Sequence, residues 1–235
     1  MTVRVDLLPG DHTRHTVPDS AVARVPFHAA SAGLYSLYGK RPFDLVLLVA
    51  ILPIIVPVML VTVLALMISG AAPFYTQDRV GQHGRIFRIW KFRTMHPDAD
   101  HLLDRILSSD PVLREEWALS QKLKHDPRIT PLGHILRKAS IDELPQVWNV
   151  LRGEMSFLGP RPMLPEQASL YGPGLSVYTA LRPGISGRWQ VSERNETFFI
   201  RRVDLDMEYA RDLSFWNDLK LVARTLRTVL YSTGY

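Results

Sequence analysis

The sequence contains no cysteine in its 235 residues, so disulfide bonds, thiolate nucleophiles and thiolate zinc sites are excluded. Acidic residues are also few. There are 23 of them against 28 lysines and arginines, which leaves a formal net charge of +5 and a pI of about 9.6. A basic excess favours phosphate-rich partners, namely nucleic acid, anionic lipid headgroups or nucleotides.

One long stretch, residues 45–68 (LVLLVAILPIIVPVMLVTVLALMI), has no charged side chain. A straight helix of roughly 24 residues, at about 1.5 Å per residue, covers about 36 Å and exceeds the ~30 Å hydrocarbon core of a bilayer. A buried core helix of this length would carry a polar edge, so we expect insertion into a membrane. The stretch begins too far into the chain, and is too long, for a cleaved signal peptide.

Two prolines, Pro53 and Pro57, lie near the middle of this stretch. Each removes a backbone N–H and clashes with the preceding turn, so a helix broken there leaves two arms of roughly 15 Å, about half the hydrocarbon core. Basic residues flank both ends, Lys40 and Arg41 before it and several cations within residues 79–93 after it, and short basic flanks stay cytoplasmic. The residues favour a re-entrant helix-break-helix, with a kinked single span as the alternative.

Three regions follow from this pattern. Residues 1–37 are weakly patterned and form an N-terminal extension that is loose or bound to the surface. Residues 38–72 hold the re-entrant membrane helix. Residues 73–235 are long enough for one compact domain with its own core.

Residues 74–95 predict a β-hairpin, because FYTQDRV and RIFRIWKFRTM flank a glycine-rich turn. Its cations lie either on a solvated edge strand or on a face that binds phosphates or headgroups. Residues 98–107 and 112–123 have helical spacing of apolar residues and are separated by Asp110-Pro111. This amphipathic pair packs on the domain or lies on the membrane surface.

The remaining helices have recognisable starts. Thr130 and Pro131 predict an N-cap and the first helical residue, and the chain is helical again from about Thr197. The last helix begins at Ser214 and carries Asp218 in its first turn. It has a basic face and an apolar face, formed by Lys220, Arg224 and Arg227 and by Leu219, Val222, Leu226 and Leu230. Such a helix binds an anionic membrane surface or packs on a soluble domain, and both interpretations stay open.

Two adjacent acids, Asp142 and Glu143, lie in the segment SIDELPQ. Pro145 lacks an N–H and suits the first turn of a helix, which places Asp142 at or next to the N-cap of a helix that ends at Gly153. Unpaired N–H groups and the positive end of the helix dipole converge there. Ordinary capping, which stabilises a helix by roughly 0.5–2 kcal/mol, accounts for the acids as well as an anion-handling site does.

Residues 159–162 (GPRP) hold Arg161 between two prolines that restrict the backbone. A planar bidentate donor in a constrained position suits phosphate, although a simple surface turn explains the segment equally. Residues 182–191 predict a turn that leads into a short strand.

Together these stretches resemble the monotopic bacterial phosphoglycosyl transferases, also called bacterial sugar transferases, from residue 40 to the C-terminus. The shared stretches are KRPFD (40–44), RVG (79–81), KFRTM (91–95), DELPQ (142–146), NVLRG (149–153), GPRP (159–162) and RPGISG (182–187). Family members often read SGRN where this chain reads SERN at 192–195, so Glu193 replaces a glycine and bears on the shape of that loop and on sugar selection.

The resemblance implies a reaction. A nucleotide diphospho-sugar, usually a UDP-sugar, gives its sugar-1-phosphate to polyprenyl phosphate, usually undecaprenyl phosphate, and a nucleoside monophosphate leaves. The product would prime exopolysaccharide, capsule or O-antigen assembly, and downstream glycosyltransferases would use it. The resemblance further implies an α+β, mainly helical fold with short β-hairpins, amphipathic surface helices and a re-entrant membrane helix. The catalytic domain, residues 73–235, would lie on the cytoplasmic face of the bacterial inner membrane among its lipids.

The resemblance also implies roles for individual residues. Asp142 would be the nucleophile and Glu143 its metal-assisting partner, and the two would hold Mg²⁺. Substrate and phosphate contacts would come from Lys91, Arg93, Arg137, Arg161, Arg182, Gln190 and Asp218. The chemistry is compatible, because a carboxylate can attack phosphorus to form an acyl phosphate and Mg²⁺ offsets the charge of a diphosphate.

The alternative from another class is a membrane-anchored protein that binds anionic lipid or nucleic acid through its basic hairpin and last helix. That hypothesis leaves the acidic pair without a function, and few aromatic residues alternate with the cations as nucleic-acid stacking requires. We therefore expect no nucleic-acid partner.

Overall fold

The computed structural model describes residues 33–120, 123–192 and 199–230 and is mainly helical with a few short strands, as predicted. The α-helices are α1 (Lys40–Ile68), α2 (Ala99–Ser109), α3 (Pro111–Ser120), α4 (Pro131–Lys138), α5 (Val147–Arg152), α6 (Gly174–Ala180), α7 (Arg188–Ser192), α8 (Phe199–Arg211) and α9 (Phe215–Leu230). The strands are β1 (Phe74–Val80), β2 (Ile86–Phe92), β3 (Ser156–Leu158) and β4 (Gly184–Ser186). A π-helical turn, η1 (Tyr35–Gly39), and three 3₁₀ helices, η2 (Gln82–Gly84), η3 (Ile141–Gln146) and η4 (Pro165–Tyr171), complete the elements.

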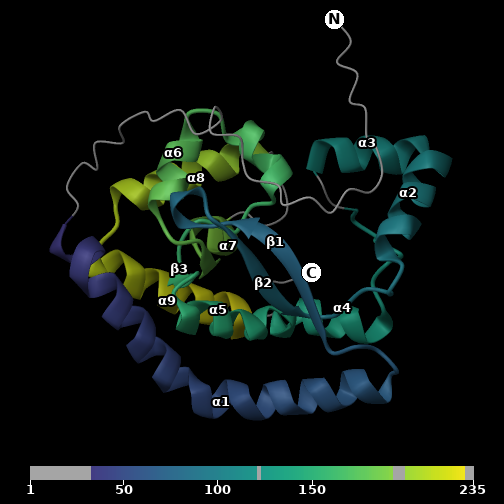
Figure 1. Ribbon diagram of the computed structural model, residues 1–235, viewed down its shortest axis with the longest axis horizontal. Helices are drawn as coiled ribbons and strands as arrows, with labels where there is room; N and C mark the ends of the chain where they lie inside the picture. Colours follow the sequence, from purple (N-terminus) through teal and green to yellow (C-terminus); the bar gives the residue numbers. More distant parts are fainter. Residues whose placement is uncertain (1–32, 121–122, 193–198, 231–235) are drawn as a thin grey trace, which may run out of the picture.

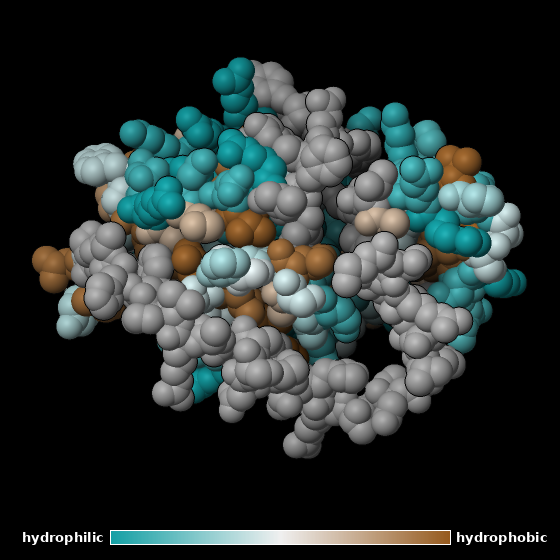
Figure 2. Space-filling model, turned by 90° about the horizontal axis from the view of Figure 1, so that it is seen from above, coloured by the Kyte–Doolittle hydropathy of each residue, from teal (hydrophilic) through white to brown (hydrophobic). Residues whose placement is uncertain are grey.

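Helix α1 runs along one side of the molecule, and α9, α5 and α4 follow it in a row (Figure 1). Helices α6 and α8 lie on the side away from α1, while α2 and α3 project at one end. Seen from the side away from α1, the described surface is mostly hydrophilic, with small apolar groups between (Figure 2). The largest run of exposed apolar side chains belongs to α1 and includes Val46, Val49, Ile54, Leu60, Val61, Leu64 and Ile68.

The predicted interruption of the apolar helix at its prolines is wrong. Pro53 and Pro57 lie inside α1, which is helical without a break over its 29 residues but bends along its length (Figure 1). Proline removes a hydrogen bond and kinks a helix, yet the turns on either side can keep their own bonds. Within the described residues this is the one helix long and apolar enough to cross a membrane, and its topology there stays a prediction.

Both ends of α1 contact the same domain. At the first end, the Lys40 ammonium lies 2.8 Å from a carboxylate oxygen of Asp218 in α9, and Arg41 donates to two carbonyls of α5. Near the other end, Leu66 packs in a buried cluster with Phe92 of β2. Helix α1 is therefore anchored at both ends, and between them Leu48 and Ile55 are also buried while most other side chains are exposed.

The predicted hairpin is confirmed. Strands β1 and β2 pair antiparallel over their full length, with Tyr75 opposite Lys91, Gln77 opposite Ile89 and Arg79 opposite Phe87. The second strand pair is not a hairpin, which corrects the expectation of several. Strands β3 and β4 are parallel. A parallel pair needs a long crossover connection, which η4 and α6 provide between the two strands.

Several local predictions are confirmed. The Thr130 hydroxyl accepts from the Gly133 N–H, and Pro131 opens α4. The Asp110 carboxylate accepts from two N–H groups at the start of α3, and α9 begins directly after Ser214. The predicted continuation of α3 to residue 123 passes through residues 121–122, which lie outside the described chain.

Two other local predictions need correction. The acidic pair lies in the first turn of a 3₁₀ helix whose N-cap is Ser140, at φ 56°, so Pro145 is inside η3 and not in the first turn of the following α-helix. In a 3₁₀ helix each N–H bonds to the carbonyl three residues earlier, with poorer geometry than in an α-helix. Pro145, which has no N–H, therefore costs η3 only one weak hydrogen bond. Residues 188–192 form α7 and not a strand, although β4 precedes them as expected. The helix does end at Gly153, at φ 79°.

Of the predicted N-terminal extension, residues 1–37, residues 1–32 lie outside the described chain, as does the segment 193–198 with Glu193. The end of the extension is not loose, because Tyr35–Gly39 form η1 directly before α1 and the Tyr35 hydroxyl donates to Asp218.

Candidate active site

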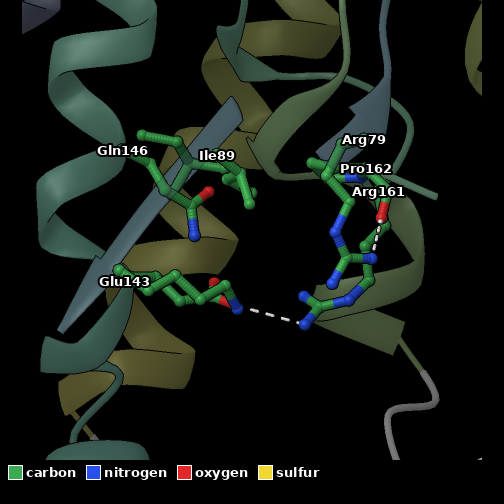
Figure 3. A pocket seen from close by; sticks show the side chains of 8 residues that line it. Arg79, Ile89, Glu143, Gln146, Arg161 and Pro162 are labelled. Carbon is green, nitrogen blue, oxygen red and sulfur yellow. Dashed lines mark hydrogen bonds and ion pairs between the residues drawn. The ribbon is translucent and has the colours of Figure 1, made fainter. Parts of the chain in front are cut away.

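A small hollow opens to solvent between the hairpin, η3 and the segment that follows β3. Its lining residues are Arg79, Ile89, Lys91, Glu143, Gln146, Arg161, Pro162 and Ile185. The hollow thus unites residues that are far apart in the sequence, with three cations and one acid among them. Figure 3 shows Arg79 and Arg161 reaching in from one side towards Glu143 and Gln146 on the other.

Glu143 is the acid that faces this hollow. One of its carboxylate oxygens, Oε1, lies 2.9 Å from the Lys91 ammonium and 3.2 Å from a guanidinium nitrogen of Arg161. Two cations that share one carboxylate oxygen keep an excess of positive charge. A phosphate group entering here would therefore meet cations already held in place.

Asp142, its neighbour, is buried, with only 9% of its surface exposed, and does not line the hollow. Burial is the largest cause that raises the pKa of this carboxyl, because it disfavours the charged form. The charge of Glu143 raises the pKa further, while Lys91 and Arg137 lower it. Adjacent positions on η3 thus place the two acids in different surroundings.

Arg137 reaches Asp142 from α4. Its Nε donates to the Thr94 hydroxyl at 2.9 Å, which fixes the guanidinium behind the end of β2. Burial lowers the pKa of Arg137, and the charge of Asp142 opposes that change. Arg137, like Lys91 and Arg161, therefore acts electrostatically on both acids.

The GPRP segment is held tightly enough to aim Arg161. A Cβ on Gly159 would lie 2.4 Å from the carbonyl oxygen of Arg182, so only glycine allows the chain to pass there. After the segment, Met163 forms a β-bridge with Val80 at the end of β1. The restricted backbone expected from the two prolines is therefore reinforced by both neighbouring strands.

Five predicted binding residues do not line the hollow: Arg137, described above, and Arg93, Arg182, Gln190 and Asp218. Arg93 and Arg182 contact main-chain carbonyls of β1 and of the end of α5. Gln190 is buried and donates to a carbonyl of β4. Asp218 is fully buried beside Lys40. Their roles in substrate binding stay predictions.

Arg79 is a lining residue that was not predicted. The hairpin register places Arg79 opposite Phe87 and Lys91 opposite Tyr75, and paired side chains in a sheet point to the same face. Arg79, Ile89 and Lys91 therefore share a face. The sequence did contain a signal for this. Side chains alternate between the two faces of a strand, and counting back from Lys91 through the turn places Arg79 on the face of Lys91.

The surroundings of Arg79 are electropositive. Burial, followed by the charges of Arg161 and Arg202, lowers the pKa of Arg79 to about 10. The guanidinium still carries its charge at neutral pH, at the cost of repulsion from its neighbours. An anion bound in the hollow would offset that repulsion.

The two acids are a suitable donor set for magnesium. Across the described parts of the chain, no three or more histidine, aspartate or glutamate side chains gather where they could hold a metal alone. Mg²⁺ commonly binds through one or two carboxylates together with substrate phosphates. Asp142 and Glu143 fit a magnesium ion that arrives with a diphosphate, and do not form a complete protein cage.

The sequence profile described as "Bacterial sugar transferase" matches residues 35–232 of this chain, nearly all of the part that carries the fold and the hollow. The chain belongs to the bacterial sugar transferase family. It is 42% identical over 199 residues to the "UDP-galactose-lipid carrier transferase" of Erwinia amylovora. It is 40% identical over 199 residues to the "Undecaprenyl-phosphate galactose phosphotransferase" of Salmonella typhimurium.

These family members differ in length. The matches to the two relatives above cover 85% of this chain but only 42% of each relative. The "Exopolysaccharide production protein ExoY" of Sinorhizobium fredii is 39% identical over 196 residues, which cover 83% of this chain and 87% of that protein. The resemblance noted in the sequence is thus confirmed at the level of the family.

Proposed function

We propose that this protein transfers a sugar-1-phosphate from a nucleotide diphospho-sugar, a UDP-hexose, to undecaprenyl phosphate and so primes exopolysaccharide-type glycan synthesis. The observation that carries the proposal is one hollow, lined in part by Arg79, where Lys91 and Arg161 pair with Glu143 and also act on the buried Asp142. Names of the relatives, which include a lipid carrier transferase and an undecaprenyl-phosphate phosphotransferase, support the choice of donor and acceptor.

In the first step a carboxylate oxygen of Asp142 attacks the phosphorus that carries the sugar. The bond from that phosphorus to the bridging oxygen breaks, and the electron pair leaves with UMP. An aspartyl phosphosugar remains on the enzyme. Splitting the transfer in this way exchanges one difficult encounter of two anionic substrates for two separate displacements.

The cations bind the diphosphate and stabilise its negative charge. Lys91 and Arg161 already meet at one oxygen of Glu143, and from there they reach the oxygens of a diphosphate. Fixed cations stabilise the charge that develops on the leaving group without reorganising during the reaction. Magnesium, held by Asp142 and Glu143 with the diphosphate, would supply further charge neutralisation.

In the second step an oxygen of the polyprenyl phosphate attacks the same phosphorus. The bond between phosphorus and the Asp142 oxygen breaks, which restores the carboxylate and releases the polyprenyl diphospho-sugar. Such a lipid product needs further glycosyltransferases to extend it. Because the acceptor phosphate lies at the membrane surface, the hollow must lie at that depth.

The anchoring of α1 supports a re-entrant topology. Lys40 and Arg41 at its first end and Leu66 near its second end all contact the catalytic domain, so both ends of α1 lie on the side of that domain. Because α1 is bent (Figure 1) and carries two prolines that favour kinking, its exposed apolar side chains would dip into the bilayer and return. The donor nucleotide sugar places this side in the cytoplasm, at the inner membrane.

The covalent route is tested with the purified full chain, magnesium and UDP-galactose labelled on the sugar-linked phosphate, without lipid. We expect stoichiometric UMP release together with labelled protein, and we expect Asp142→Asn to lower both by at least about 10³-fold because an amide is a poor nucleophile. Glu143→Gln, which keeps the nucleophile, should retain a labelled adduct at a lower rate.

Undiminished turnover by Asp142→Asn would exclude the covalent route. UMP release only when undecaprenyl phosphate is present would indicate direct transfer in a ternary complex. A panel of other UDP-hexoses in the same assay identifies the sugar. Binding of anionic lipid vesicles without any UMP release would favour the alternative of a membrane-binding protein.

A further inference from the structure

A buried arginine, Arg202, and a partly buried one, Arg79, hold two consecutive carbonyls of the main chain at Arg161. A guanidinium nitrogen of Arg202, on α8, donates to the carbonyl of Arg161 itself. A guanidinium nitrogen of Arg79, on β1, donates to the next carbonyl, that of Pro162, at 3.1 Å. Arg161 then extends from this clamped segment to Glu143, so its position depends on elements from two distant parts of the sequence.

Arg202 is itself fixed by neighbours that do not belong to the hollow. Its guanidinium lies 5.6 Å from the centre of the Tyr171 ring and 3.9 Å from an oxygen of Asp206. The Tyr171 hydroxyl donates to the same carboxylate at 2.8 Å. Arg202, Tyr171 and Asp206 are all buried, with exposed fractions of 7%, 3% and 4%.

We propose that Arg202 is a positioning residue for Arg161, and that through it α8 sets where the phosphate-binding guanidinium lies during sugar-phosphate transfer. Arg202 does not line the hollow and acts through the Arg161 carbonyl. The inference rests on the proposed function and deepens it. A cationic group must be held to within a fraction of an ångström to stabilise a transferring phosphoryl group, and a clamp on its own carbonyl achieves this.

The clamp must be separated from the charge that Arg202 contributes. Arg202 lies close enough to Arg79 to lower its pKa, so its charge alone raises the positive potential near the hollow. Lysine at position 202 would keep the charge but not the planar fork that serves both Asp206 and a carbonyl. Arg202→Lys therefore isolates the clamp, whereas Arg202→Met removes clamp and charge together.

The test is a double-mutant cycle on the full chain, measured as single-turnover UMP release from UDP-sugar with magnesium. We expect Arg202→Lys to lower the rate by about 10-fold and Arg202→Met by up to about 100-fold, since a misplacement of about 1 Å can lower a rate by about 10². In an Arg161→Ala background each should cost less than about 3-fold, because its target is gone. Arg188→Met is the matched control, because Arg188, on α7, ion-pairs with Glu208 of α8, the helix that carries Arg202. Its small effect on the rate should be the same in the wild-type and Arg161→Ala backgrounds.

Calorimetric binding of pyrophosphate with magnesium provides a second readout of the same cycle that needs no turnover. If wild type releases no UMP from any UDP-sugar, the proposed function fails, and the pyrophosphate cycle still tests the clamp. The inference is overturned if, in either readout, an Arg202 substitution has the same fold effect in the Arg161→Ala background as in wild type, because the two residues would then act independently. It is also overturned if Arg202→Lys is indistinguishable from wild type. If Arg202→Met does not fold, Arg202→Lys and Asp206→Asn carry the cycle.

Discussion

Asp142 and Glu143 are neighbours in the chain that experience opposite surroundings. Glu143 faces the hollow and already carries two cations on one oxygen. Asp142 is buried, and burial rather than any single neighbour dominates its raised pKa. One acid is thus suited to contact with a bound diphosphate and its metal, and the other to attack from a site with little water.

The raised pKa of Asp142 predicts an acid limb in the first step. A protonated carboxyl cannot attack phosphorus, so the rate of UMP release should fall with decreasing pH around a midpoint above the ordinary aspartate value of about 4. Arg137→Met removes a charge that lowers this pKa and should move the midpoint upward. The measurement is single-turnover UMP release as a function of pH.

Lys138→Met serves as the control, because Lys138 is the next residue of α4 and its side chain is exposed. Its midpoint should match that of wild type. A midpoint that moved downward in Arg137→Met would mean that Arg137 does not stabilise the Asp142 carboxylate.

At the scale of elements, α9 does more than present a basic amphipathic face. Its Asp218 accepts hydrogen bonds from Tyr35 and Tyr209 and pairs with Lys40, so one fully buried carboxylate joins the start of α1 to α8 and α9. Two side chains of the predicted apolar face, Leu219 and Leu226, remain 40% and 57% exposed. Helix α9 therefore anchors α1 through one face and leaves apolar groups on another.

Asp218→Ala should destabilise the fold by about 3 kcal/mol or more, because it leaves Lys40 buried without its closest partner. Thermal unfolding in detergent measures this, and Asp212→Ala, which removes an acid that is 52% exposed, should change little. The KM for UDP-sugar of the folded Asp218→Ala protein should equal that of wild type. A raised KM with unchanged stability would instead support the substrate-binding role predicted for Asp218 from the sequence.

For the whole molecule, the central question is how one bent helix meets the bilayer. Both ends of α1 are tied to the catalytic domain, and the side chains exposed between them are apolar. A span would have to pull Lys40 away from Asp218 and expose both charges. The fold therefore favours an insertion that enters and leaves on one side.

Cysteine labelling tests this topology without background, because the chain has no cysteine of its own. Tyr38→Cys and Ala72→Cys place exposed thiols before and after α1, and Asp78→Cys marks the catalytic domain. In intact cells and inverted vesicles, all three should react with an impermeant maleimide from the cytoplasmic side alone. Labelling of Tyr38→Cys from the opposite side only would restore a single span.

Several features followed from the sequence because their causes are local. The uncharged run of residues 45–68, the Thr130 cap and the stop at Gly153 depend on neighbours within a turn or two. The family motifs likewise brought Lys91, Asp142, Glu143 and Arg161 into one hypothesis, and all four meet in the structure.

Only the tertiary structure decided the remainder, because those contacts join residues that carry no sequence signal for each other. The hairpin register turned Arg79 into the hollow, and the packing of α8 brought Arg202 to a carbonyl 41 residues away. A main-chain acceptor has no side chain by which a pattern could reveal it. The apolar run set the length of α1 and its affinity for a bilayer, but only the Lys40–Asp218 pair, 2.8 Å apart, tied its first end to the catalytic domain.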